Sequence, residues 1–298
     1  MNLSLRTRER LFAILLLAPT MVFVVLFAFY PIASSFYLSL HRIIIGLPGL
    51  GSRFVGLDNY RTLIHDQIAQ KALINTLLFV FVTTFFEILF GLLIALLINQ
   101  RFRGRGIIRA SILVPWAIPT VVSSQMWRFI FNDKYGLINL ILFGSDISRY
   151  KAWLAEPGYA FLAIIIADVW KTSSFAALLI LAGLQIIPEE LYLAAKVDGA
   201  GPWKRFTSIT LPLVRPALLI ALLFRTMDAF RVFDLVFVMT QGGPADSTNV
   251  LQFYGYKKIF AEGLMGYGST ISVLVFSLTF VISLLYIRMV GKRLTRGS

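Results

Sequence analysis

Oppositely charged residues stand three positions apart inside two long apolar runs of the sequence. Asp168 and Lys171 occur in one run, and Arg225 and Asp228 occur in the other. Residues three apart share a helix face, so each helix would carry a carboxylate and a cation side by side. A central charge in a membrane span costs roughly 2.5–3.5 kcal/mol on insertion scales, and such residues therefore face a bundle interior or a watery cavity.

Two interpretations of these charges stay open. In the first, they are pairs that neutralise each other and hold the helices together. In the second, they line a site for a polar, uncharged solute such as a sugar, because carboxylates accept hydrogen bonds from hydroxyls while Lys and Arg donate to them. The rings of Trp170 and Phe175 can then cover the face of a pyranose.

Glu87 is a lone carboxylate in a further apolar run. We expect it to hydrogen-bond a polar partner such as Gln125. A proton relay, as in a secondary transporter, is the alternative, but no second membrane carboxylate lies near it in the sequence.

The composition is that of an all-α polytopic membrane protein. Of the 298 residues, 58% are hydrophobic and 14% are charged, and the mean hydropathy is +0.78, whereas about 25% of a soluble domain is charged. The formal net charge of +13 comes largely from Lys and Arg at the edges of apolar runs, which favours membrane topology over nucleic-acid binding. Cysteine is absent, and His41 and His65 are expected to be solvated, so no metal site is predicted.

Six apolar runs are long enough to cross a bilayer of roughly 30 Å. Pro115 and Pro119 interrupt the third run, where they predict a kink that serves either helix packing or a cavity. The first run exceeds the apolar core of a signal peptide, about 7–15 residues, so we expect it to remain as a span. After a tail over 1–10, residues 11–298 are predicted to form one membrane domain with spans at 11–30, 73–98, 107–131, 159–184, 213–239 and 269–290.

The distribution of Lys and Arg orients these spans. The two termini and the short loops at 99–109 and 185–215 hold 15 Lys and Arg, whereas the three longer loops on the other side hold 10. The positive-inside rule then places both termini and the 185–215 loop in the cytoplasm.

The segment from Pro188 to Pro212 is a polar loop built like two short helices. Pro188 suits a helix start, and Gly199 and Gly201 allow a sharp stop. Apolar side chains that are rimmed by charge are typical of a docking surface, although the loop can also fold against its own helices. A hairpin this short has no core of its own in which to bury the apolar side chains of Leu191, Tyr192, Val197, Trp203 and Phe206.

The same segment resembles the EAA loop of ABC-importer permeases, whose pattern is E-A-A-x3-G-x9-I-x-L-P. The matching residues, at the family spacing, are Ala194-Ala195, Gly199, Ile209, Leu211 and Pro212, and Asp198-Gly199-Ala200 is similar to the family's D-G-A. Leu193 departs from the pattern, because it stands where the family has its Glu. In that family the loop is the coupling helix that sits in a cleft of the ATPase subunit. The coupling residues implied here are Glu190, Tyr192, Ala194, Ala195, Asp198, Gly199, Ala200, Trp203 and Phe206.

The stretch from Asp168 to Pro244 resembles the maltose-type sugar permease family, and most of all its trehalose-transporter branch. The likeness is carried by Trp170-Lys171-Thr172 and by Phe224 through Asp234. It implies a type I ABC-importer permease that moves a sugar, and a disaccharide such as trehalose or maltose is the expected substrate. The sugar-contacting residues implied by the resemblance are Asp168, Lys171, Thr172, Phe175, Arg225, Asp228, Ala229 and Val232.

The resemblance also implies a complex in the cytoplasmic (inner) membrane. Its other parts would be a second, paralogous permease, two copies of an ABC ATPase and an extracytoplasmic sugar-binding protein. The chain lacks a G-x-x-x-x-G-K-[ST] loop, so it cannot cradle ATP phosphates itself. We therefore expect no cofactor and no catalysis in this chain, with ATP and Mg bound by the ATPase partners.

Two other function classes stand against this interpretation. A secondary transporter, driven by protons or Na⁺, needs a carboxylate relay or an inverted repeat, and neither is clear in the sequence. A membrane-embedded enzyme needs a metal constellation or a Ser-His or Cys-His set, and no such pattern supports it.

Overall fold

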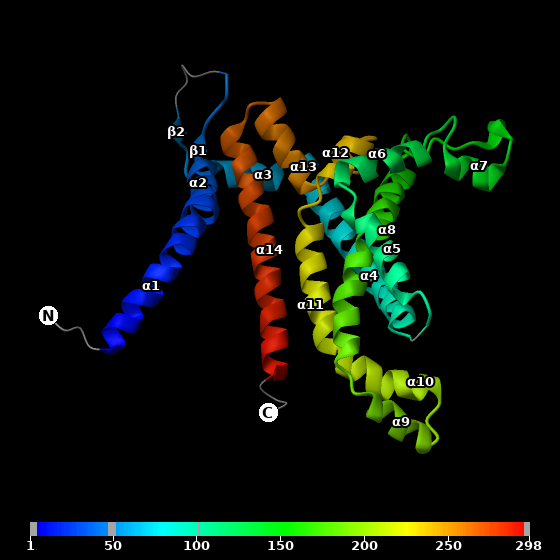
Figure 1. The fold of residues 1–298 in the computed structure, drawn as a ribbon. Coiled ribbons are helices and arrows are strands. Elements are labelled where there is room, and N and C mark those ends of the chain that lie inside the picture. The colour runs from blue at the N-terminus through cyan, green and yellow to red at the C-terminus, as the bar shows by residue number, and fades with distance from the viewer. Residues whose placement is uncertain (1–4, 47–51, 101, 295–298) are drawn as a thin grey trace. The chain divides into compact units, whose positions relative to one another are not determined.

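The computed structural model describes residues 5–46, 52–100 and 102–294, and most of these are helical (Figure 1). Two short strands, β1 (His41–Arg42) and β2 (Arg53–Phe54), pair antiparallel. Short π-helical segments cover Val25–Phe29, Phe206–Thr210 and Lys257–Ala261, and a 3-10 turn covers Ile147–Arg149. The α-helices are α1 (Leu5–Val24), α2 (Tyr30–Ser39), α3 (Asp58–His65), α4 (Gln67–Asn99), α5 (Arg105–Ala117), α6 (Thr120–Ile130), α7 (Leu137–Phe143), α8 (Pro157–Gln185), α9 (Glu189–Val197), α10 (Pro202–Arg205), α11 (Leu211–Ala229), α12 (Asp234–Met239), α13 (Leu251–Tyr256) and α14 (Met265–Leu294).

The chain forms two compact units. The first holds the residues up to His65 together with Gly255–Leu274, and the second holds Asp66–Tyr254 and the residues from Val275 onward. All charged residues of the apolar runs discussed above lie in the second unit. The candidate site can therefore be described within that unit alone.

His41 lies in the first unit and is buried, so the expectation of a solvated side chain is wrong. Its exposed fraction is 8%, and its ring packs on Tyr37 with centroids 4.2 Å apart. Its Nδ1 lies 2.8 Å from the Tyr37 carbonyl oxygen, one helical turn earlier. His65 is exposed, as expected.

The described residues contain five continuous helical runs that are long and apolar enough to cross a membrane, and a bent helix pair supplies a sixth. The all-α membrane architecture predicted from composition is therefore confirmed. The continuous runs are Phe12–Ser39, Gln67–Asn99, Pro157–Gln185, Pro202–Ala229 and Met265–Arg288, and the bent pair is α5 with α6.

The first run extends further than the predicted end at residue 30. A π-helical segment precedes Pro31, and the Tyr30 N–H donates to the carbonyl of Val25 rather than to that of the residue four before it. Pro31 then falls in the first turn of α2, where a missing N–H is tolerated. The helix consequently continues through Ser39.

The third predicted span is two helices that meet at 89°. Pro119 has no N–H and restricts the residue before it to extended backbone. Ile118 accordingly has φ −67° and ψ 131°, and α5 ends at Ala117. The expected kink is a complete break of the helix.

The fifth predicted span, over 213–239, is also divided. The helical run begins earlier, at Pro202, and ends at Ala229. The Arg231 N–H donates to the Asp228 carbonyl at 3.0 Å and the Val232 N–H donates to the Ala229 carbonyl at 3.2 Å. These i to i−3 bonds tighten the last turn, and α12 follows as a separate short helix.

Small residues let α4, α8 and α11 approach closely in the second unit. A Cβ atom built on Gly91 of α4 would lie 2.8 Å from the Cβ of Ala176, and one built on Gly183 of α8 would lie 2.3 Å from the Cβ of Ala217. Both distances are shorter than real carbon contacts, so glycine is required at these crossings. The buried core beside them contains Ala95, Ile98, Ile180, Leu181, Leu184, Val214 and Ala221.

We expect Gly183→Leu to destabilise the helix bundle by about 1–3 kcal/mol, because a side chain there must push α11 away from α8. The matched control is Gly158→Leu in the same helix, where an added Cβ meets nothing within 4 Å. Thermal unfolding of both variants in detergent measures the difference. Equal midpoints for the two variants would contradict the close contact of α8 and α11.

Candidate functional site

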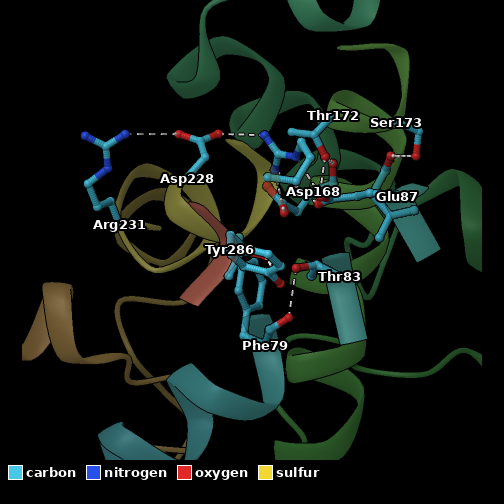
Figure 2. A network of polar contacts seen from close by, with 12 residues as sticks. Phe79, Thr83, Glu87, Asp168, Thr172, Ser173, Asp228, Arg231 and Tyr286 are labelled. Carbon is cyan, nitrogen blue, oxygen red and sulfur yellow. Dashed lines mark hydrogen bonds and ion pairs between the residues drawn. The ribbon is translucent and has the colours of Figure 1, made fainter. Parts of the chain in front are cut away.

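Polar side chains of α4, α8 and α11 meet at one buried place in the second unit. Glu87 comes from α4, Asp168 and Thr172 from α8, and Arg225 from α11. Figure 2 shows Glu87, Asp168 and Thr172 close together, with Asp228 and Arg231 to one side. The exposed fractions are 0% for Glu87, 7% for Asp168, 5% for Thr172 and 2% for Arg225. The charges therefore face the bundle interior, as their membrane location requires.

Arg225 and Glu87 form the central ion pair of this network. Arg225 Nε donates to Glu87 Oε2 at 2.6 Å, and Arg225 Nη2 donates to Glu87 Oε1 at 3.2 Å. Two bonds thus join the guanidinium fork to both carboxylate oxygens. Thr172 Oγ1 donates a further bond to Glu87 Oε1 at 2.8 Å. The pair connects all three helices.

The expected bond between Glu87 and Gln125 is wrong, because Gln125 is an exposed residue of α6. Glu87 is the residue of the network that sequence reasoning left out of the site. Charge balance gave no signal for it, because Lys171, Arg225 and Arg231 inside the spans are already matched by Asp168, Asp228 and Asp234. The available signal was a lone acid within an apolar run, which faces the bundle interior.

Asp228 and Arg231 form the open side of the network. Arg225 Nη1 donates to Asp228 Oδ2 at 2.7 Å, which is the i,i+3 pair expected from the sequence. Arg231 Nη2 lies 4.0 Å from Asp228 Oδ1, and the side chains of Asp228 and Arg231 are 59% and 63% exposed. This end of the network is consequently accessible from outside the chain.

Lys171 does not form the expected pair with Asp168. Its Nζ donates instead to two backbone carbonyls, to that of Ile118 at 2.5 Å and to that of Trp116 at 3.2 Å. Both carbonyls stand at the break between α5 and α6. The positive charge is therefore held by the end of a helix rather than by a carboxylate.

Asp168 is buried but keeps one oxygen without a hydrogen bond. No donor reaches its Oδ2 among the described residues. The ion-pair contact of this oxygen is Arg225 Nη2, at the long distance of 3.9 Å. A buried carboxylate oxygen without a donor is unusual in a folded protein.

A cavity of about 120 Å³ adjoins the network. All of the predicted sugar-contacting residues line it except Phe175, which stacks on Trp116 at 5.4 Å and meets the edge of Phe224. Trp170 contacts Trp127 edge-on at 5.6 Å and is likewise outside the lining. Small-molecule sites usually measure about 300–1,000 Å³, so this chain alone supplies only part of one. The lining residues are Thr120, Asp168, Lys171, Thr172, Arg225, Asp228, Ala229, Arg231, Val232, Phe233, Asp234 and Leu235.

The segment over 188–212 forms a helical hairpin at the opposite end of α8 from α6 and α12 (Figure 1). Gly199 has φ +77°, a conformation that favours glycine, and it ends α9 sharply. Val197 and Trp203 are 88% and 75% exposed. Tyr192 is half-buried because its hydroxyl bonds Thr210 Oγ1 at 3.0 Å.

The other implied coupling residues lie on the same hairpin. Glu190, Ala194, Asp198 and Gly199 are exposed, and so is Leu193, which departs from the family pattern. The half-buried ones are Ala195, Ala200 and Phe206. The hairpin thus leaves part of its apolar surface uncovered in the described part of the chain, whereas Tyr192 and Phe206 are half-buried.

Comparison with known proteins assigns the chain to a family. Residues 87–296, more than half of the chain, match the model described as "binding-protein-dependent transport system inner membrane component". The chain belongs to this family. The assignment confirms the ABC-importer permease resemblance drawn from the EAA-like segment, and it decides against the secondary transporter.

Full-length relatives within this transport family have similar sequences. The "trehalose/maltose transport system permease protein MalF" of Thermococcus litoralis is 42% identical, over 96% of this chain and 95% of its own. The "trehalose transport system permease protein SugA" of Mycobacterium tuberculosis is 39% identical, over 96% and 91%. The "sulfoquinovosyl glycerol transport system permease protein SmoG" of Agrobacterium fabrum is also 39% identical, over 95% and 91%.

A solved structure gives the same architecture. A chain from a bacterial ABC transporter involved in the import of the acidic polysaccharide alginate has a TM-score of 0.81, with 96% of each chain covered and 22% sequence identity. This similarity confirms the predicted type I ABC-importer permease fold. In this family member, the buried network of Glu87 and Arg225 lies between α4, α8 and α11.

We expect Glu87→Gln to destabilise the protein by about 3–5 kcal/mol, because Arg225 would become a buried charge without its main partner. The matched control is Asp228→Asn, which removes the exposed end of the same network and should change stability by at most about 1 kcal/mol. Thermal unfolding in detergent compares the two variants.

The double variant Glu87→Gln with Arg225→Gln tests the pairing itself. Its loss should be smaller than the sum of the two single losses, because neither Glu87 nor Arg225 is then left buried without the other. Additive losses would show that the two side chains stabilise the fold independently and would contradict the central ion pair.

Proposed function

We propose that this chain is the permease subunit of an ATP-driven ABC importer that moves a sugar into the cell. The observation that carries the proposal is the cavity beside the buried network, where Asp168 Oδ2 has no hydrogen-bond donor among the described residues. A sugar hydroxyl would supply that donor. The named substrates of the relatives in Thermococcus and Mycobacterium, trehalose and maltose, support a disaccharide.

The charges around the cavity suit a solute without net charge. In the lining, three cations, Lys171, Arg225 and Arg231, offset three acids, Asp168, Asp228 and Asp234, so no single sign dominates. Sugar hydroxyls both donate and accept, and a mixed lining of carboxylates and cations can satisfy both capacities. The relatives named above are named for different substrates, so their overall likeness does not by itself fix the sugar.

The small volume of the cavity supports a second permease subunit. Asp228 and Arg231 are exposed at its edge, where a facing chain can enclose a disaccharide together with Ala229 and Val232. A paralogous partner permease would complete the site, and an extracytoplasmic binding protein would deliver the sugar. In this proposal the chain lies in the cytoplasmic (inner) membrane with both termini in the cytoplasm, in agreement with its Lys and Arg distribution.

The hairpin over 188–212 supplies the link to energy in this proposal. The sequence has no phosphate-binding loop, so two copies of an ABC ATPase would bind ATP and Mg and would receive α9 in a cleft. This chain would then hold no cofactor and would not be catalytic itself. Glu190 lies one turn before Leu193 on α9 and takes the part of the missing family Glu, since both residues are exposed.

We expect Asp168→Asn to raise the half-saturating sugar concentration at least about tenfold, because loss of a charge-assisted hydrogen bond costs about 1.5–3 kcal/mol. Stability should remain close to that of the unmodified protein, since no donor to Oδ2 is lost. Sugar-stimulated ATPase activity of the reconstituted complex, measured over a panel of disaccharides, provides the test.

The control for this experiment is Glu262→Gln, which removes a partly exposed carboxylate paired with Lys258 in a different part of the chain. It should leave the half-saturating concentration unchanged. If Asp168→Asn behaves like this control for every sugar that stimulates the complex, the proposed site is wrong. If no sugar stimulates the complex, the proposed substrate class is wrong.

We expect Trp203→Ala and Gly199→Pro to weaken retention of the ATPase subunits during purification while the chain still inserts into the membrane. Trp203 is exposed on the hairpin, and the φ of +77° at Gly199 cannot be adopted by proline. The matched control is Tyr135→Ala, which removes an aromatic ring that is 66% exposed outside the hairpin. Normal ATPase retention by both hairpin variants would refute the coupling role.

A further inference from the structure

The broken third span leaves backbone carbonyls that a continuous helix would satisfy. In an uninterrupted helix the Trp116 carbonyl would accept from the N–H of Thr120, but the chain turns by 89° before that residue. No backbone N–H donates to the carbonyls of Trp116 or Ile118 in the described part of the chain. In an apolar surrounding such orphan carbonyls strongly disfavour the conformation that creates them.

Lys171 of α8 satisfies both carbonyls with one ammonium group. Its Nζ lies 2.5 Å from the Ile118 oxygen and 3.2 Å from the Trp116 oxygen. A cation at this place also complements the negative end of the α5 dipole. No carboxylate lies within ion-pair distance of Lys171 among the described residues. The Lys171 ammonium therefore binds the two carbonyls at the helix break rather than a carboxylate.

The helix that follows this break adjoins both the cavity and a second hollow. Thr120, at the start of α6, lines the 120 Å³ cavity. Arg128, near its end, lines a polar pocket of about 360 Å³ and donates from Nη1 to the Val238 carbonyl at 3.4 Å. The short helix α12 runs beside α6 between the same two hollows. A shift of α6 would therefore change the wall of both.

Lys171 is itself part of the cavity lining, together with Asp168 and Asp228. A solute hydroxyl in the cavity offers its ammonium an alternative acceptor at short range. The same nitrogen cannot keep its present geometry on the two carbonyls and also turn fully toward the solute. A solute in the cavity and the two carbonyls at the helix break therefore compete for the Lys171 ammonium.

We propose that Lys171 is a positioning residue that holds the break between α5 and α6, and that solute in the cavity draws its ammonium from the Trp116 and Ile118 carbonyls and releases α6. The holding role follows from the contacts of Lys171 alone. The release step rests on the proposed function, because it requires a hydroxylated solute in this cavity.

Distance measurements between two spin labels can test both parts in the assembled complex. The chain has no cysteine, so cysteines introduced at Ile107 and Phe129 are its only labelling sites once the partner subunits are made cysteine-free. Ile107 of α5 and Phe129 of α6 are 75% and 53% exposed. With a rise of 1.5 Å per residue and a right-angle bend, the labelled backbones lie about 20 Å apart, within the range of pulsed electron paramagnetic resonance.

Without solute, we expect Lys171→Met to widen and shift the distance distribution, and Lys171→Arg to keep it narrow because Arg still donates to the carbonyls. Lys151→Met is the control, since Lys151 donates to the Tyr159 hydroxyl away from the break. If Lys171→Met does not assemble, Lys171→Gln replaces it, and its neutral amide should give an intermediate width. If Lys171→Met, or Lys171→Gln in its place, gives the same solute-free distance distribution as the unmodified chain, the holding role is overturned.

With a saturating disaccharide that stimulates ATPase activity, the unmodified chain should shift toward the distribution of Lys171→Met, and that variant should not respond further. A stimulating sugar that leaves the distances unchanged would overturn the release step. A role of Lys171 in sugar contact alone would raise the half-saturating concentration without any solute-free shift. If no sugar stimulates the complex, the proposed function fails, while the solute-free comparison still decides the holding role.

Discussion

Arg225 and Glu87 meet where three helices pack so closely that neither charge can reach water on its own. Their side chains are 3% and 0% exposed. A lone charge at such a place would be prohibitive, but a two-bond pair with a further bond from Thr172 satisfies both groups. Each of α4, α8 and α11 contributes one member. The relative register of these helices therefore depends on this polar contact together with the close crossings at Gly91 and Gly183.

The same contact determines which carboxylate oxygens of the network remain without a hydrogen-bond donor. Arg225 uses Nε and Nη2 on Glu87 and Nη1 on Asp228. Because Glu87 takes most of the guanidinium, Asp168 remains 3.9 Å from Nη2 and without a hydrogen bond to Oδ2 in the described structure. One buried carboxylate is thus fully paired, and its neighbour keeps an oxygen without a donor among the described residues. A network of this kind can stabilise the fold and recognise a solute at once, so the two interpretations that the sequence left open are compatible.

Backbone breaks are the second device on which the site depends. The helical runs are interrupted after Ala117 and after Ala229, and both interruptions lie beside the charged network. Non-helical backbone at membrane depth is tolerated only where protein or a watery cavity surrounds it. At the first break, Lys171 donates hydrogen bonds to the carbonyls that the break exposes. The tight turn after Ala229 brings Val232 and Asp234 into the cavity lining. At the far end of α8 the hairpin exposes Trp203, so one helix connects the cavity region to the proposed docking surface.

The sequence by itself determined those features that depend on local composition and spacing. Apolar length identified the membrane helices, the i,i+3 interval identified the Arg225–Asp228 pair, and the glycine at 199 identified the end of α9. Only the tertiary structure decided contacts between distant segments. Glu87 and Arg225 are 138 residues apart, and nothing in the period of either helix shows which face of one meets which face of the other. Lys171 binds two backbone carbonyls instead of Asp168, because the helix break beside it leaves those carbonyls without a backbone donor. Phe175 stacks on Trp116 and does not line the cavity. Periodicity defines a helix and its faces, whereas the partner of a buried charge depends on how separate helices cross.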